Sequence, residues 1–121
     1  MSLKNIKIIN LVHKDFEDLE LWYPVLRLRE EGITVHIAGE QAGKTYYGKN
    51  GVPAEADIGF SEMDPEVYHG LVVPGGWAPD KLRRYKEIID FTKALNEQEK
   101  PIGEICHAGW VLISANILKG K

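Results

Sequence analysis

The sequence has 121 residues, a formal net charge of -3 and a hydrophobic fraction of 44%, which together allow one globular domain and exclude intrinsic disorder. Acidic and basic residues are interspersed and nearly balanced, so we expect no nucleic-acid partner. No apolar stretch approaches the roughly 20 residues of a membrane span, so we expect no membrane partner.

The first part of the chain predicts one strand and one helix. Its start is short and polar, so we expect no secretory signal there. Residues 7–12 are rich in β-branched side chains and predict a buried strand. Apolar side chains then follow a near-helical spacing from Leu19 to Leu28, and Gly32 is expected to end this helix.

The start of that helix has two candidate caps, Asp15 and Asp18, and Pro24 within it is expected to introduce a kink. A second strand is predicted at residues 33–38, where β-branched and apolar side chains recur. Residues 43–56 contain several glycines around tyrosine and valine, a pattern typical of a small hairpin or an irregular excursion.

The second half of the chain repeats the alternation of strand and helix. A third strand is predicted at residues 70–73, and residues 79–97 carry the apolar spacing of one or two helices. Residues 101–105 predict a fourth strand, and residues 108–118 a final helix that Gly120 stops.

This alternation predicts the α/β fold class. Strands separated by helices pair in parallel through right-handed crossovers, so we expect an open, doubly wound sheet with strand order 2-1-3-4. No repeat or linker divides the chain, which predicts a single domain over residues 1–121. Because the last predicted helix leaves the outer strand edge bare, we expect this domain to be a fragment that lacks a C-terminal portion.

The segment around Cys106 is the strongest candidate for chemistry. A predicted strand ends there, the chain turns, and a helix begins, which is the arrangement of a nucleophile elbow. A tight turn exposes the side chain, and the positive end of the following helix stabilises the thiolate over the thiol. A second interpretation stays open, in which Cys106 is a small buried hydrophobic residue.

Cys106 is also the only cysteine, so an internal disulfide is excluded and a reducing, cytoplasmic environment is favoured. The four histidines show no spacing typical of metal ligands, and we expect neither a metal site nor a cofactor.

Two backbone segments are candidates for an oxyanion site. The N–H of His107 directly follows the nucleophile, and the N–H of Gly76 follows the third predicted strand, whose end should lie beside the fourth. Gly75 and Gly76 would allow a close approach of backbone to ligand. The imidazole of His107 is a candidate base, although it is equally typical of a solvent-facing histidine in a first helical turn.

Three acids, Asp15, Glu17 and Asp18, follow the first strand and should lie near the same place. A carboxyl group there is expected to donate a hydrogen bond to sulfur. For Asp15 and Asp18 we favour the alternative, that they cap the first helix.

Three motifs resemble the PfpI intracellular protease family of the class I glutamine amidotransferase-like superfamily. They are Asp-Phe-Glu-Asp-Leu-Glu-Leu at residues 15–21, Val-Val-Pro-Gly-Gly at residues 72–76, and Ile-Cys-His at residues 105–107, followed by Leu-Ile-Ser-Ala at residues 112–115. The resemblance spans essentially the whole chain at the same spacing. It implies a flavodoxin-like, three-layer α/β sandwich with a mostly parallel sheet.

The resemblance also implies roles for single residues. Cys106 would be the nucleophile, Glu17 the acid that contacts its sulfur, and His107 the partner imidazole, with oxyanion amides from Gly76 and His107. Asp80 occupies the place of an acid that protease-like members donate to a neighbouring subunit, although those members carry Glu there. Members assemble as dimers or hexamers, so self-association is expected.

Two positions depart from the family pattern. Trp77 stands where protease-like members often have Arg, and Trp110 stands in a segment where Pro-Gln is frequent. Together with Gly75 they are expected to line a narrow and apolar pocket, unless the indoles pack into the core or an interface. Family members also continue for a further strand-rich section and a final helix.

These features predict a cysteine-dependent hydrolase or lyase in which a thiolate attacks a carbonyl carbon. The substrate is expected to be a small carbonyl compound, in glyoxalase or deglycase chemistry, or a peptide. An alternative is a redox-sensing or stress-protective protein that acts through oxidation of Cys106 without turnover. A third hypothesis is a truncated, inactive domain.

Overall fold

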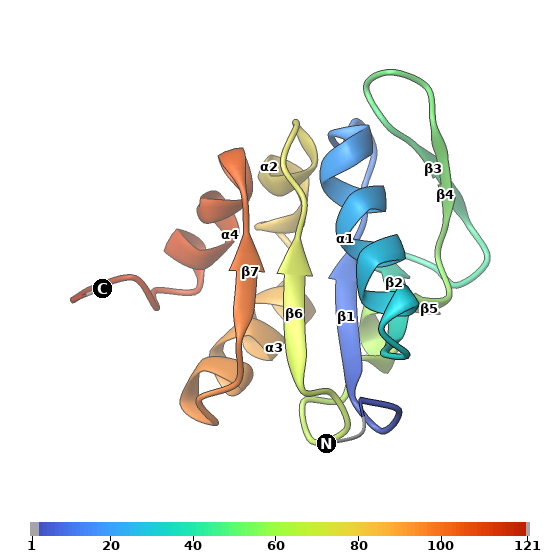
Figure 1. Ribbon diagram of the computed structural model, residues 1–121. Coiled ribbons are helices and arrows are strands. Elements are labelled where there is room, and N and C mark those ends of the chain that lie inside the picture. Colours follow the sequence, from blue (N-terminus) through green and yellow to red (C-terminus); the bar gives the residue numbers. More distant parts are fainter. Residues whose placement is uncertain (1–2, 121) are drawn as a thin grey trace.

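The computed structural model describes residues 3–120 and contains a five-stranded parallel sheet with the order β5-β2-β1-β6-β7 (Figure 1). The strands of this sheet are β1 (Lys7–Leu11), β2 (Thr34–Gly39), β5 (Ile58–Gly59), β6 (Gly70–Val73) and β7 (Ile102–Glu104). The helices are α1 (Asp18–Glu30), α2 (Ala78–Leu82), α3 (Lys86–Glu97) and α4 (Gly109–Ser114). Two 3-10 turns, η1 (Phe60–Glu62) and η2 (Cys106–Ala108), and an antiparallel hairpin of β3 (Thr45–Tyr47) and β4 (Pro53–Glu55) complete the elements.

The α/β class and the order of the four predicted strands are confirmed. In chain order those strands are β1, β2, β6 and β7, and the sheet arranges them as 2-1-3-4. The sequence did not predict β5, which pairs in parallel with β2 beyond the predicted edge. With only two residues, β5 is too short to leave an alternating pattern.

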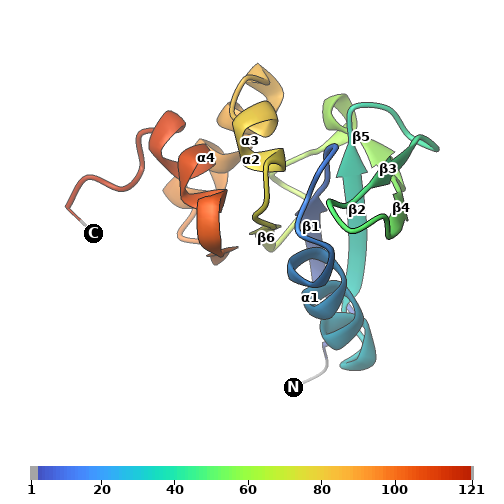
Figure 2. The ribbon, with the colours of Figure 1, turned by 90° about the horizontal axis from the view of Figure 1, so that it is seen from above.

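The elements form three layers. α1 lies on one face of the sheet, and α2, α3 and α4 lie on the other (Figure 2). In β1, at the centre of the sheet, residues of both faces are buried, as is typical of parallel sheets, whereas β7 at the edge is partly exposed. Fully buried side chains of the strands include Ile9, Leu11, Leu71 and Val73. Each such burial stabilises the fold by roughly 1.5–3 kcal/mol.

The start of α1 differs from the expected capping. Glu17, rather than Asp15 or Asp18, is the N-cap, and its Oε1 accepts a hydrogen bond from Leu19 N at 3.3 Å. Asp18 is buried, and its carboxylate accepts hydrogen bonds from the N–H groups of Asn50 at 3.0 Å and Val52 at 2.9 Å. The chain turn between β3 and β4 is therefore fixed to the first turn of α1.

The last helix is shorter than the apolar spacing over residues 108–118 predicts. It begins as the 3-10 turn η2, continues as α4, and ends at Ser114. Asn116 adopts a left-handed backbone conformation with φ of 59°, which the helix cannot accommodate. The apolar side chains after it therefore follow the helical spacing without being helical.

Candidate active site

The backbone at Cys106 forms the sharp turn that the sequence predicts. β7 ends at Glu104, Ile105 is extended with φ of -146°, and Cys106 has φ of 58° before the chain enters η2. A left-handed conformation at a residue other than glycine costs about 1 kcal/mol or more and persists only where the surroundings impose it. The side chain of Cys106 is exposed, so the interpretation as a buried hydrophobic residue is wrong.

The loop after β6 lies directly against this turn, and both of its glycines are required there. A Cβ on Gly75 would lie 2.7 Å from Cys106 Cβ and 3.1 Å from the carbonyl oxygen of Ile105. Gly76 has φ of 78°, and a Cβ there would lie 2.7 Å from the carbonyl oxygen of Asp15. Backbone can therefore approach the elbow only because these two positions lack side chains.

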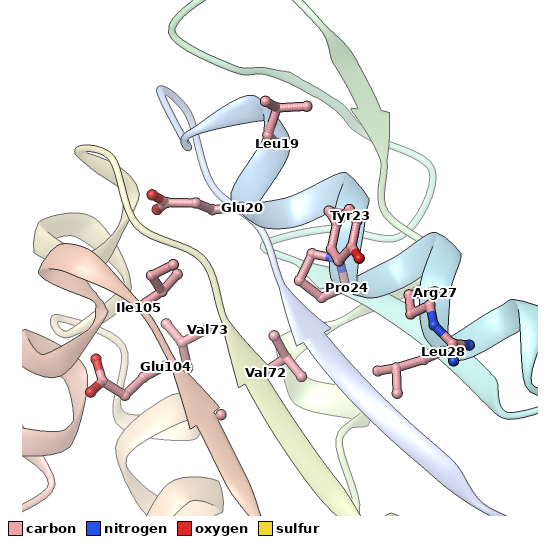
Figure 3. Close-up of a pocket in the computed structure, with 11 residues that line it drawn as sticks. Leu19, Glu20, Tyr23, Pro24, Arg27, Leu28, Val72, Val73, Glu104 and Ile105 are labelled. Carbon is pink, nitrogen blue, oxygen red and sulfur yellow. The ribbon is translucent and has the colours of Figure 1, made fainter.

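The acid beside the elbow is Glu20. Its Oε1 accepts a hydrogen bond from Gly75 N at 3.0 Å, and a Cβ on Gly75 would collide with that same oxygen. Since the missing methyl group would touch both Glu20 and Cys106, these two side chains are neighbours across Gly75. Figure 3 shows the carboxylate extending from α1 toward the loop that follows β6.

The structure places Glu17, the acid expected beside the sulfur, in a different contact. One of its carboxylate oxygens caps α1, and the other lies 3.2 Å from the ammonium group of Lys49. Glu17 and Glu20 lie three positions apart, on the same side of the helix. The residue types do not reveal which of the two faces Cys106, because that depends on the position of α1 along the sheet.

The imidazole of His107 lies in a stack of three aromatic rings. It is 4.3 Å from the ring of Trp110 with an interplanar angle of 14°, and 5.7 Å from the ring of Trp77 at 27°. The guanidinium of Arg83 also approaches the Trp110 ring, 5.9 Å from its centroid. The two tryptophans therefore lie around His107 rather than in the core.

Comparison with known proteins identifies the family of this chain. The sequence pattern of the DJ-1/PfpI family matches residues 6–121. The chain belongs to this family. The resemblance to the PfpI proteins and the flavodoxin-like fold expected from it are thereby confirmed.

Individual members of the DJ-1/PfpI family are similar to this chain in sequence or in structure. Over 116 residues the chain is 43% identical to a deglycase of Thermococcus kodakarensis, in a match that covers 96% of this chain and 69% of that protein. Over 115 residues it is 40% identical to YraA of Bacillus subtilis, which is provisionally named as a cysteine protease. That match covers 95% of this chain and 68% of YraA. A solved two-domain protein of Anabaena variabilis, with DJ-1/ThiJ/PfpI-like and ferritin-like domains, superposes with a TM-score of 0.93 at 33% identity, covering 96% of this chain and 34% of that one.

Asp80, the acid expected to serve a neighbouring subunit, lies in α2 and is paired within its own chain. Its Oδ2 is 2.7 Å from Arg84 Nη2, and both side chains are largely exposed. This i,i+4 pair directs the carboxylate along the outside of α2.

A groove of this DJ-1/PfpI chain lies apart from the expected pocket of Gly75, Trp77 and Trp110. It has a volume of about 550 Å³ and lies between α1 and the C-terminal ends of β6 and β7 (Figure 3). Its wall is mostly apolar and is formed by Leu19, Glu20, Tyr23, Pro24, Arg27, Leu28, Val72, Val73, Gly103, Glu104 and Ile105. Glu20 and Ile105 connect this groove to the elbow.

A hydrogen-bonded chain of three side chains, which the sequence did not predict, lies at the ends of β1 and β2. Lys14 N donates to His13 Nδ1 at 2.8 Å, so His13 carries its proton on Nε2, 3.0 Å from the hydroxyl of Tyr85. That hydroxyl donates to Glu40 Oε2 at 2.7 Å.

Burial lowers the pKa of His13 below its usual value, although the carboxylate of Glu40 opposes this shift. Burial and then the hydrogen bond to Glu40 raise the pKa of Tyr85 to about 12. Within residues 3–120, the His, Cys, Asp and Glu side chains form no group of three or more that could hold a metal ion. The helices of that same range are too short or too polar to cross a membrane.

Proposed function

We propose that this chain is a cysteine-dependent enzyme whose thiolate at Cys106 attacks the carbonyl carbon of a small reactive aldehyde, in the reducing environment of the cytoplasm. One observation supports the proposal. The side chain of Cys106 is exposed, its backbone is left-handed, and the residue lies against Gly75 and beside Glu20. A strained and exposed side chain at a strand-to-helix turn is typical of a nucleophile. The names of the deglycase relatives support the same class of substrate.

The first step forms a bond between Sγ of Cys106 and the aldehyde carbon of a 2-oxoaldehyde. The carbonyl electron pair moves to oxygen, which becomes an alkoxide, and the N–H groups of Gly76 and His107 are the proposed donors to it. Both segments adjoin the elbow, because Gly75 lies against Cys106 and His107 follows it. With six residues, α4 contributes less dipole to the thiolate than the longer predicted helix would.

In the second step a proton moves from the former aldehyde carbon to the neighbouring carbonyl carbon. The alkoxide collapses to a C=O bond, the electron pair of the neighbouring carbonyl moves to its oxygen, and that oxygen takes a proton from water, which gives a thioester of a 2-hydroxy acid. We assign Glu20 as the base that carries the proton between the two carbons, because its carboxylate lies beside Cys106. Water then hydrolyses the thioester, which releases the 2-hydroxy acid and restores the thiolate. His107 is the proposed proton carrier in this hydrolysis.

Peptide hydrolysis is a second candidate, which the name of the Bacillus subtilis relative favours. A peptide needs an extended groove and an acid that protonates the leaving amine. The groove beside Glu20 and Ile105 has a volume of about 550 Å³ and could accept an extended side chain. We rank the small aldehyde first, because its chemistry uses only groups that adjoin Cys106.

A redox or stress-protective role without turnover is the third candidate, favoured by the exposure of the single thiol of Cys106. An accessible thiolate is also the form that oxidises to sulfenic and sulfinic acid. Intact mass after mild peroxide separates the two roles. Addition of oxygen at Cys106 without turnover of any aldehyde or peptide would favour the sensor.

Self-association as a dimer or hexamer, with Asp80 reaching a neighbouring site, is also a proposal. Its carboxylate is exposed enough to meet a second subunit, although the ion pair with Arg84 would have to rearrange. Light scattering of the wild type, and turnover of Asp80→Asn, test this role.

The deciding experiment follows the conversion of methylglyoxal to lactate by the purified chain. We expect measurable turnover by the wild type and none by Cys106→Ser, with both proteins folded by circular dichroism. Equal rates in the two proteins would refute a covalent role of Cys106.

A further inference from the structure

We infer that Trp77 is a specificity-determining residue that gives this site a preference for carbonyl compounds with a planar aromatic substituent. The inference rests on the proposed attack of Cys106 on a carbonyl carbon and names the substrate class of that same site. It is carried by the position, the fixed orientation and the exposure of one indole ring.

The backbone of Trp77 is held on both sides. Its N–H donates to the carbonyl oxygen of Asp15 at 2.9 Å, and the preceding Gly76 pairs with Phe16 through an isolated bridge. On its other side Trp77 is the residue from which α2 begins. The backbone of Trp77 is therefore held in place, and it fixes the direction in which the side chain leaves the loop.

The indole is fixed by the ring stack that begins with it. Trp77 stacks on His107, and His107 stacks on Trp110. Behind Trp110, the guanidinium of Arg83 is itself held by a hydrogen bond from Nε to Ser114 Oγ at 2.8 Å. A ring that is already ordered loses little conformational entropy when a ligand stacks on it.

The indole nevertheless remains largely exposed. Trp77 is 56% exposed, whereas tryptophan is highly buried on average. One face of its ring meets His107, and the exposed remainder is open to a ligand. A rigid, exposed aromatic surface binds planar apolar groups by offset stacking.

The stack lies next to the atom that would carry the substrate. Trp77 is two positions after Gly75, whose missing methyl group would touch Cys106, and its ring stacks on the residue that follows Cys106. A substituent on a carbon bonded to Sγ therefore lies within reach of the indole. An aryl group gains a stacking partner there, whereas a methyl group covers only part of the ring.

The test compares alkylation of Cys106 by phenacyl bromide and by bromoacetone, which differ only in an aryl or a methyl substituent on the ketone. Each rate is divided by that of glutathione, which removes the intrinsic reactivity of the reagent. After this division the aryl-to-methyl ratio of glutathione is 1 by definition, and we expect the ratio of the wild-type protein to be several-fold above 1. We expect Trp77→Ala to lower it about three- to tenfold and Trp77→Phe to keep most of it.

A matched control is Tyr47→Ala, which removes an exposed aromatic side chain from the hairpin and should leave the ratio unchanged. A wild-type ratio equal to that of glutathione, or a ratio that Trp77→Ala does not change, overturns the inference. This result needs no turnover. If only the proposed function is wrong, alkylation will still show the predicted preference for the aryl reagent, but the protein will convert neither phenylglyoxal nor methylglyoxal.

Discussion

The carboxylate of Glu20 accepts a hydrogen bond from the amide of Gly75 at 3.0 Å, across the loop that lies against Cys106. This contact joins the first turn of α1 to the end of β6. It therefore fixes the distance between the helix that supplies the acid and the turn that supplies the thiol. The hydrogen bond leaves the second carboxylate oxygen of Glu20 available for proton transfer.

Replacement of Glu20 by Gln separates this role from a structural one. The amide keeps the size of the side chain but cannot act as a base, so we expect turnover of methylglyoxal to fall about 100-fold or more. The measurement is kcat from lactate formation, with the midpoint of urea unfolding as a check on the fold.

Glu17→Gln is the matched control for that variant. Glu17 caps α1 and pairs with Lys49, so we expect turnover within about threefold of the wild type and a loss of stability below about 1 kcal/mol. A larger loss of turnover in Glu17→Gln than in Glu20→Gln would assign the role of the base to Glu17 instead of Glu20.

Two glycines with positive φ should respond differently to alanine. At Gly51, with φ of 89°, an added Cβ would lie more than 4 Å from every heavy atom of residues 3–120 outside Gly51 and its two chain neighbours, so only backbone strain of about 1 kcal/mol is expected. At Gly76, with φ of 78°, the Cβ would also press on backbone atoms of Asp15 and Glu17. We expect Gly76→Ala to cost about 1–3 kcal/mol more in urea unfolding and to abolish turnover. Equal costs would show that the loop is looser than its contacts indicate.

Acidification should weaken the fold through His13. Its pKa in the folded chain lies below the ordinary value, mainly because the ring is buried, with Glu40 opposing and Lys81 and Lys44 adding to the shift. Between the ordinary value of 6.5 and the lower folded value the unfolded chain binds more protons, so stability falls as pH falls through this range. Urea unfolding of the wild type should therefore show a lower stability at pH 5.5 than at pH 7.5.

His13→Asn isolates this contribution from that of the carboxylates. Its stability should be lower at both pH values, but the difference between them should shrink. A difference as large as in the wild type would assign the pH dependence to other groups, of which Asp18 and Glu40 also have a lowered pKa.

Asp18→Asn tests the link between α1 and the hairpin. Burial alone would raise the pKa of Asp18, but the hydrogen bonds from Asn50 and Val52 lower it, which favours the charged form. Loss of that charge-assisted pair should cost about 1–3 kcal/mol and expose the turn between β3 and β4 to proteolysis. Asp64→Asn, which alters an exposed local contact with Glu66, should change stability by less than about 0.5 kcal/mol. Similar costs for the two variants would contradict this link.

The sequence predicted the parts of the fold that rest on local patterns. Four short apolar runs, most of them separated by segments with helical spacing, predicted the order of β2, β1, β6 and β7. The position of Cys106 between a predicted strand and a predicted helix indicated the elbow. The end of α4 could not be predicted from the sequence, because the apolar spacing continues past Ser114 although the backbone turns at Asn116.

The parts that could not be predicted depend on distant contacts. Glu17 and Glu20 have equal chemistry, and only the position of α1 on the sheet brings Glu20 to Gly75. The contact between His13 and Tyr85 joins residues 72 positions apart, and that between Tyr85 and Glu40 joins residues 45 apart. No local sequence pattern predicts such contacts, because they are set by the packing of helices onto the sheet.

The reactivity of Cys106 toward iodoacetamide at pH 7 tests the central claim most directly. A thiol that serves as a nucleophile at an exposed elbow should be alkylated faster than glutathione under the same conditions, as followed by intact mass. Alkylation at the rate of glutathione or more slowly would contradict the assignment of Cys106 as the nucleophile.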